Sequence, residues 1–258
     1  MNFLIKVLLS CYLLFSVTES SAQIVTIPLS DDVLDVLVIA QSNFGTGEVG
    51  VDSRINNNIT IWNQKKKAFQ VWGDGGTPEW NKKYLDLWPL HFAKALLKKE
   101  NVKIRFVVDA RGGQLLEVWL NSGSRHEILN KKIRSCGIKK YDLVLFAQGE
   151  SNSKLVASGR QTVSDYIRLL AELRGHLKRE GVINKDTPWI VLEQAKGGVG
   201  KGGEPTDYLN EQIWDKVPPP FHVIKTGDLS TKKDGVHFTS KSLQTIGQKA
   251  CDMILLSR

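Results

Sequence analysis

Three residues of this chain have the types needed for nucleophilic acyl chemistry, namely Ser42, Asp234 and His237. A serine hydroxyl attacks poorly unless a base takes its proton during the attack, and an imidazole commonly serves as that base. Asp234 lies three residues before His237, so its carboxylate can hold the imidazole in the correct tautomer and stabilise its cationic form. Roughly 190 residues separate Ser42 from this pair, so the chemistry requires a fold that joins them.

The attack on a carbonyl group creates an oxyanion, which needs preorganised hydrogen-bond donors worth roughly 3–4 kcal/mol each. The backbone N–H of Ser42 is one candidate donor. A glycine of the pair Gly112-Gly113 is a second, because a residue without a Cβ lets the backbone approach a substrate closely. The side-chain amide of Gln148 or Asn152 is a third, and the sequence leaves open which of the two it is.

Ser42 and the candidate oxyanion donors each follow an apolar segment that is typical of a buried strand, whereas Asp234 and His237 do not. The segments and the polar motifs after them are Val36–Ala40 before Gln41-Ser42-Asn43, Val102–Val108 before Asp109-Ala110-Arg111-Gly112-Gly113, and Leu143–Ala147 before Gln148-Gly149-Glu150-Ser151-Asn152. Open α/β sheets build their sites at the carboxyl edge of the strands. We therefore expect these motifs to meet at one edge of a sheet, together with the turn that carries Asp234 and His237.

Strand-like and helix-like segments alternate along the chain. The further strands that we expect are Trp189–Leu192 and Phe221–Ile224, and the expected helices are Leu85–Lys99, Leu115–Ser122, Val163–Arg179 and Ser240–Leu256. This alternation predicts the α/β class, as a three-layer α/β/α sandwich with a central, mostly parallel, five-stranded sheet of flavodoxin-like type. Two long stretches, 43–84 and 195–220, are expected to be irregular, and loops of this length are usually functional or mobile.

The first 22 residues are predicted to be a cleaved secretory signal peptide. Lys6 precedes a mostly apolar run, Val7–Val17, and Ser20-Ser21-Ala22 is a small-residue cleavage site. Residues 23–258 then form one domain, because no repeat and no Pro/Ser-rich linker divides them. No later segment approaches the roughly 18 apolar residues of a membrane-spanning helix. We therefore expect a secreted or periplasmic protein without a membrane span.

Charge and cysteine usage narrow the functional classes. The formal net charge is +8, but the basic residues are scattered, which favours an ordinary soluble surface over nucleic-acid binding. Cys136 and Cys251 remain after the predicted cleavage. In an exported protein they can form a disulfide or stay as two buried thiols, and the sequence leaves this open. Because the chain has no CxxC pair and no Cys/His cluster, we expect no metal and no other cofactor.

The four polar motifs resemble the SGNH (GDSL-like) hydrolase superfamily, and within it the sialate O-acetylesterase-like branch of carbohydrate acetylesterases. That branch typically has Gly-Gln-Ser-Asn, Gly-Gly-Thr with a later Trp, Gln-Gly-Glu and Asp-x-x-His, in this order. The counterparts here are Ala40-Gln41-Ser42-Asn43, Gly112-Gly113-Gln114 with Trp119, Gln148-Gly149-Glu150-Ser151-Asn152 and Asp234-Gly235-Val236-His237. Ala40 and Gln114 depart from the pattern of the branch, and both lie beside the expected chemistry rather than in it.

The resemblance implies a role for each matching residue. Ser42 would be the nucleophile, His237 the base and Asp234 the carboxylate that orients it. The implied oxyanion donors are Ser42, Gly113, and Gln148 or Asn152. The residues implied to support the substrate and the loops are Gln41, Asn43, Gly112 and Glu150.

Ordinary structural explanations compete with some of these roles. In isolation, Ser42 or Asn43 would more often cap a helix after the strand, and Gly112-Gly113 would be an ordinary turn. We expect Trp62, Trp72 and Trp80 to be structural rather than parts of a sugar site. We also expect His91 and His126 to be structural, because neither has an evident partner.

The leading hypothesis is an exported serine esterase that removes O-acetyl groups from a carbohydrate through an acyl-enzyme. A carbohydrate O-acetyltransferase would use the same three residues, and sequence separates the two poorly. A non-catalytic glycan-binding protein on the same fold is a third hypothesis, against which the presence of all three residues counts. The expected partner is an acetylated carbohydrate rather than a nucleic acid, and the expected state is a monomer.

Overall fold

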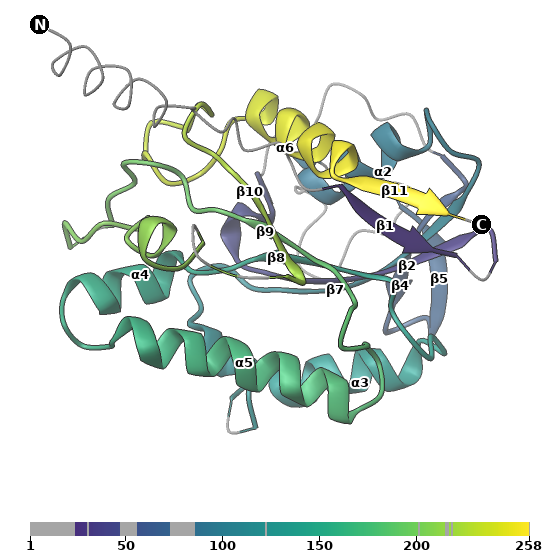
Figure 1. Cartoon of the computed structure of the whole chain (residues 1–258), viewed down its shortest axis with the longest axis horizontal. Coiled ribbons are helices and arrows are strands. Elements are labelled where there is room, and N and C mark those ends of the chain that lie inside the picture. Colours follow the sequence, from purple (N-terminus) through teal and green to yellow (C-terminus); the bar gives the residue numbers. More distant parts are fainter. Residues whose placement is uncertain are drawn as a thin grey trace, which may run out of the picture.

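A central sheet of seven strands organises the described part of the chain (Figure 1). The computed structural model describes residues 24–29, 31–46, 56–72, 86–121, 123–200, 202–214, 217 and 219–257. The predicted signal peptide, residues 1–22, and Trp80 lie outside these ranges. The strands, in their order across the sheet, are β10 (Phe221–Ile224), β9 (Trp189–Leu192), β8 (Leu143–Ala147), β2 (Val33–Ala40), β7 (Lys103–Ala110), β4 (Ile59–Asn63) and β5 (Ala68–Val71). Neighbouring strands are parallel except for β4 and β5, which form an antiparallel hairpin.

The predicted fold class is confirmed, but the sheet has seven strands rather than the predicted five. The two additional strands, β4 and β5, lie within the stretch 43–84 that was expected to be irregular. β4 is buried only at alternate positions and β5 has no fully buried residue. Both therefore lack the continuous apolar run that identifies a central strand of a parallel sheet.

Helices cover both faces of the sheet (Figure 1). α2 (Trp88–Leu96) and α6 (Ser240–Asp252) pack together on one face, and α3 (His126–Ser135), α4 (Glu150–Ala157) and α5 (Val163–Arg179) lie on the other. α5 has both of its predicted ends and begins with a reciprocal capping box between Thr162 and Asp165. None of the helices in the described ranges is long and apolar enough to span a bilayer.

Three of the four predicted helices have other bounds in the structure than predicted. The predicted helix Leu115–Ser122 is only a 3₁₀ turn, η2 (Leu116–Trp119), while α3 and α4 are not predicted at all. The predicted helix Ser240–Leu256 ends at Asp252, because Ile254–Ser257 forms a strand, β11, that pairs in parallel with β1 (Val25–Pro28). A second small sheet joins β3 (Gly45–Thr46) to β6 (Asp86–Leu87), directly before α2, whose predicted start was Leu85.

Side chains of the central strands alternate between two hydrophobic cores, one on each face of the sheet. In β2, Val36 and Val38 belong to the core that contains α2 and α6, whereas Leu37 belongs to the core of α3 and α5. Cys251 lies in the first core and Cys136 in the second, and both are buried free thiols. The disulfide alternative is therefore wrong, because the sheet separates the two sulfurs.

The tryptophans that were expected to be structural fall into two groups. Trp72 is 2% exposed and packs edge-on against Phe106 of β7, so it is part of the core. Trp62 in β4 is only partly buried and packs against Phe69 of β5, the edge strand of the sheet. Trp62 therefore supports the outer hairpin rather than the centre of the molecule.

Candidate active site

The carboxyl ends of three adjacent strands bring Ser42, Gly112 and Gln148 to one edge of the sheet. β2 lies between β7 and β8, and all three run in parallel. Ser42 begins a 3₁₀ turn, η1 (Ser42–Phe44), directly after β2. A Cβ added at Gly112 would lie 3.5 Å from the Cβ of Ser42, and Gly113 has a φ of 69°, which side chains rarely allow. The three strand-end motifs thus meet at the edge where the sequence places them.

Asp234 and His237 form a closely bonded pair on the turn before α6. Nδ1 of His237 lies 2.7 Å from Oδ2 of Asp234, while Oδ1 of Asp234 accepts the backbone N–H groups of His237 at 2.9 Å and Val236 at 3.0 Å. Partial burial raises the pKa of Asp234, but the hydrogen bonds from His237 and Val236 outweigh it and lower the pKa to about 2. Because an ionised carboxylate only accepts hydrogen bonds, Nδ1 is the donor and Nε2 is left to accept a proton.

Asn43 connects the serine turn to the turn that carries the imidazole. Its Nδ2 donates to the backbone oxygen of Val236 at 2.9 Å, and its Oδ1 accepts the backbone N–H of Phe238 at 3.3 Å. The same Nδ2 also donates to Oε1 of Glu150 at 2.7 Å. No hydrogen bond joins Ser42 to His237 among the residues that the structure describes, so Asn43 is the direct link between the two turns.

Glu150 is a buried carboxylate that binds the residues on both sides of Ser42. Its two oxygens accept the side-chain amides of Gln41 and Asn43. Gln41 in turn accepts the hydroxyl of Ser151 at 3.2 Å. Burial raises the pKa of Glu150, and the hydrogen bonds from its own backbone N–H, Asn43 and Gln41 act in the opposite direction. Glu150 is only 6% exposed, so its bonds to Gln41 and Asn43 anchor the serine turn to the interior of the protein.

Gln148 and Asn152, the two candidates for a third oxyanion donor, are both fully buried and fully bonded. Nε2 of Gln148 donates to the backbone oxygen of Gln114 at 3.1 Å and to Oδ1 of Asn152 at 2.9 Å. Nδ2 of Asn152 donates to Glu117 at 3.1 Å and to Gln161 at 3.0 Å. Since neither amide has a free N–H, this geometry gives no support to either as a donor to an oxyanion.

Gln194 is a residue of this region that sequence reasoning missed. Its Nε2 donates to the backbone oxygen of Gln148 at 3.2 Å. Gly149 has a φ of 144°, and a Cβ added there would lie 2.5 Å from Nε2 of Gln194. The backbone of Gln194 is bonded at both polar groups by the side chain of Asn210. The signal that could have found Gln194 is its position just after the predicted strand Trp189–Leu192.

Asp109, at the carboxyl end of β7, is a second buried residue whose role the sequence did not reveal. It accepts Nε1 of Trp119 at 2.7 Å, Nε of Arg125 at 3.1 Å and Nζ of Lys132 at 2.9 Å, and it is fully buried. These bonds fix Trp119, Arg125 and Lys132 against the end of β7, shortly before Gly112 and Gly113 in the chain. Within the described ranges, no group of three or more His, Cys, Asp or Glu side chains is placed to hold a metal ion.

The expectation that His91 and His126 lack partners is wrong. Nε2 of His91 lies 2.5 Å from Oδ1 of the buried Asp86, five residues earlier. His126 is bonded to Asn130 at 2.9 Å, and its ring lies 4.7 Å from that of His176. Both histidines thus occupy bonded positions within the packed helices α2 and α3.

A family of carbohydrate esterases matches most of the chain. The family is described as "Carbohydrate esterase, sialic acid-specific acetylesterase", and the match covers residues 36–255, which include all four polar motifs. The chain belongs to this family. The resemblance to the sialate O-acetylesterase-like branch of SGNH hydrolases is thereby confirmed. None of the curated proteins compared with the chain matches it significantly.

Several solved structures share the fold at low sequence identity. A protein from Arabidopsis thaliana is 19% identical over 84% of this chain and 96% of its own, with a TM-score of 0.65. NanS is 14% identical over 89% of this chain and 97% of its own, with a TM-score of 0.59. A carbohydrate acetylesterase from Xanthomonas citri is 16% identical over 85% of this chain and 55% of its own, with a TM-score of 0.57. These likenesses establish the fold of this carbohydrate esterase family member.

Proposed function

We propose that this protein is an exported serine esterase that removes O-acetyl groups from a carbohydrate, with Ser42 as nucleophile, His237 as base and Asp234 as its orienting carboxylate. The observation that carries the proposal is the imidazole of His237, whose Nδ1 lies 2.7 Å from Oδ2 of Asp234. Asn43, which follows β2 next to Ser42, is hydrogen-bonded to the turn that holds this imidazole. Membership in a carbohydrate esterase family supports the substrate class. The alternative of a non-catalytic glycan-binding protein does not require such a pair.

In the first half-reaction, Oγ of Ser42 attacks the carbonyl carbon of the acetyl ester while Nε2 of His237 takes the hydroxyl proton. The carbonyl electrons move to oxygen and form the oxyanion. When the intermediate collapses, the bond to the sugar oxygen breaks, and the imidazolium gives its proton to that oxygen. Asp234, whose pKa is lowered to about 2, stays ionised throughout and stabilises the imidazolium.

In the second half-reaction, a water molecule attacks the acetyl-serine and gives its proton to Nε2 of His237. Collapse of this second intermediate breaks the ester bond to Ser42, whose oxygen recovers the proton from the imidazolium. Acetate leaves and the serine is restored. The balance is one ester and one water consumed, with one sugar hydroxyl and one acetic acid formed.

We assign the oxyanion to the backbone N–H groups of Ser42 and Gly113, each worth roughly 3–4 kcal/mol in related hydrolases. Gln148 and Asn152 then act by positioning, because Gln148 binds the backbone oxygen of Gln114, while Asn152 accepts the backbone N–H of Leu116 at 2.9 Å. Both bonds fall just after Gly113. Removing the side-chain amide of Gln148 or Asn152 would therefore weaken the support of the turn at Gly113, and would not remove a hydrogen-bond donor to the oxyanion.

The test of the chemistry is Ser42→Ala, with release of acetate measured from acetylated sialic acids and acetylated xylans. We expect kcat to fall by roughly 10⁴–10⁶-fold, as it does when a nucleophile is removed from a triad. Ser158→Ala, at an exposed serine after α4, is the matched control and should retain full turnover. Near-wild-type activity in Ser42→Ala would refute the serine mechanism.

Two further measurements separate the remaining parts of the proposal. Chromatography of the products with an unacetylated sugar present should give free acetate, whereas transfer of the acetyl group to that sugar would establish the transferase instead. Export predicts that the protein recovered outside the cytoplasm begins at Gln23, after Ala22. An intact N-terminus on cytoplasmic protein would overturn that part alone.

A further inference from the structure

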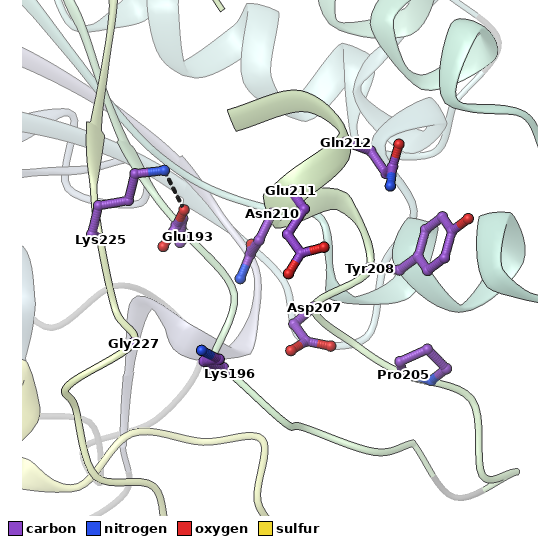
Figure 2. A pocket seen from close by; sticks show the side chains of 10 residues that line it. All are labelled: Glu193, Lys196, Pro205, Asp207, Tyr208, Asn210, Glu211, Gln212, Lys225 and Gly227. Carbon is purple, nitrogen blue, oxygen red and sulfur yellow. Dashed lines mark hydrogen bonds and ion pairs between the residues drawn. The ribbon is translucent and has the colours of Figure 1, made fainter. Parts of the chain in front are cut away.

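A polar pocket of about 520 Å³ lies beyond the carboxyl ends of β9 and β10 (Figure 2). Because β10, β9, β8 and β2 are parallel neighbours, this is the edge of the sheet that also carries Ser42. Glu193 directly follows β9 and Lys225 directly follows β10, and both side chains line the pocket. Across the sheet, β9 and β10 are the second and third strands from β2. Because neighbouring strands lie about 4.8 Å apart, the pocket begins roughly 10–14 Å from the serine turn.

One loop forms both the wall of this pocket and a contact with the turn of the candidate base. Lys196, after β9, lines the pocket. Two residues later, Gly198 lies against the turn Asp234–His237, since a Cβ added there would be 2.9 Å from the backbone oxygen of Gly235. A ligand that extends from Ser42 along this loop would therefore reach the pocket.

The charges of the pocket are mixed and largely balanced within it. Glu193 is 8% exposed and is bonded to Nζ of Lys225 at 2.9 Å, as Figure 2 shows, and to the backbone N–H of Thr226 at 3.1 Å. Asp207 accepts the backbone N–H of Gly197 at 2.7 Å. With Glu211 also present, the lining has three carboxylates and two lysines. This balance disfavours an anionic sugar.

The outward-facing groups of the pocket suit a ligand with many hydroxyl groups. Tyr208 is 41% exposed and lies on the side opposite the Lys225–Glu193 pair in the view of Figure 2. An exposed aromatic ring offers an apolar face together with a polar hydroxyl. Lys196 adds a donor and Glu211 an acceptor, both exposed. Hydroxyl groups both donate and accept, so they match this set better than a purely anionic or apolar ligand does.

We propose that this pocket, defined by Glu193, Lys196, Tyr208, Glu211 and Lys225, binds neutral sugar units of an oligosaccharide whose acetylated residue lies at Ser42. The proposal rests on the proposed esterase function and adds that the substrate is a chain rather than a single acetylated sugar. The volume of the pocket lies within the range of about 300–1,000 Å³ that is typical of ligand pockets. Binding energy from remote sugar units would then favour long substrates.

The test compares Tyr208→Ala with the wild type on acetylated xylo-oligosaccharides and on 4-nitrophenyl acetate, which is too small to reach the pocket. The measured quantity is the ratio of kcat/KM for the oligosaccharide to kcat/KM for the small ester. We expect this ratio to fall about five- to twentyfold, mainly through a higher KM for the oligosaccharide. Glu211→Ala should lower it in the same direction, and Lys185→Ala, whose side chain is 79% exposed outside the pocket, should not change it.

Each outcome decides a separate point. An unchanged ratio in Tyr208→Ala and Glu211→Ala would overturn the pocket assignment while leaving the esterase proposal intact. An effect seen only with an acetylated galacturonide, an acidic chain, would overturn the assignment to neutral sugars. Absence of activity on every ester in the wild type would refute the proposed function itself.

Discussion

Removing the side chain of Asn43 should uncouple the serine turn from the turn that carries His237. Asn43→Ala deletes the bonds to Glu150 at 2.7 Å, to the backbone oxygen of Val236 at 2.9 Å and from the backbone N–H of Phe238 at 3.3 Å. The bond to a carboxylate is worth about 1.5–3 kcal/mol and the other two about 0.5–1.5 kcal/mol each. We therefore expect the free energy of unfolding to fall by about 2.5–6 kcal/mol.

The catalytic effect of Asn43→Ala should be a loss of kcat rather than a rise in KM. Displacement of a catalytic group by about 1 Å can cost about 10²-fold in rate, so we expect kcat for 4-nitrophenyl acetate to fall by 10- to 100-fold. The assay uses the temperature range in which circular dichroism shows a folded protein, with Ser158→Ala as the control. A folded variant with kcat within twofold of the wild type would refute the positioning role of Asn43.

Two further predictions concern stability. Burial, with a contribution from nearby Asp35, raises the pKa of Asp142 to about 6; because the folded protein then binds the proton more tightly than the unfolded chain, stability falls as pH rises from about 4 to about 6. Asp142→Asn removes the cost of the buried charge. In urea unfolding the variant should be about 1–2 kcal/mol more stable than the wild type at pH 7.5 and equally stable at pH 4. Equal stability of the two proteins at pH 7.5 would contradict the reasoning. Gly149→Ala should lower the free energy of unfolding by about 1–3 kcal/mol, because φ is 144° at this residue. Gly175→Ala, within α5, should leave the free energy of unfolding unchanged or raise it by up to about 1 kcal/mol. A thermal melt that ranks the two glycine variants in the opposite order would count against this account.

Elements with strong periodicity or a continuous apolar run could be predicted closely. Val163–Arg179, Leu143–Ala147, Trp189–Leu192 and Phe221–Ile224 have the predicted bounds. α4 could not be predicted, because it is made from the polar motif after β8 and its start depends on Gly149 at a φ that the sequence does not reveal. β4 and β5 were missed because edge strands bury too few side chains to show a pattern.

The site followed from the sequence to the extent that it depends on strand ends. Ser42, Gly112 and Gln148 come together because parallel strands bring their carboxyl ends to one edge. The bonding of Asn152 could not be inferred, because its partners Glu117 and Gln161 lie in segments that carry no chemical signature. Whether an amide is free or already bonded is decided by such neighbours, so donor assignments were the weakest part of the prediction.

The pairing of β1 with β11 has a consequence for the order of folding. The register aligns Val25 with Ile254, so the contact closes a loop of nearly the whole described chain. Contacts between residues so far apart form late, because the entropy of closing the loop has to be offset by structure that already holds the ends together. α6, which leads directly into β11, also follows the turn Asp234–His237. Docking of the last strand should therefore accompany the fixing of the turn Asp234–His237, so we expect a chain stalled short of β11 to form the central sheet and to leave this turn unfixed.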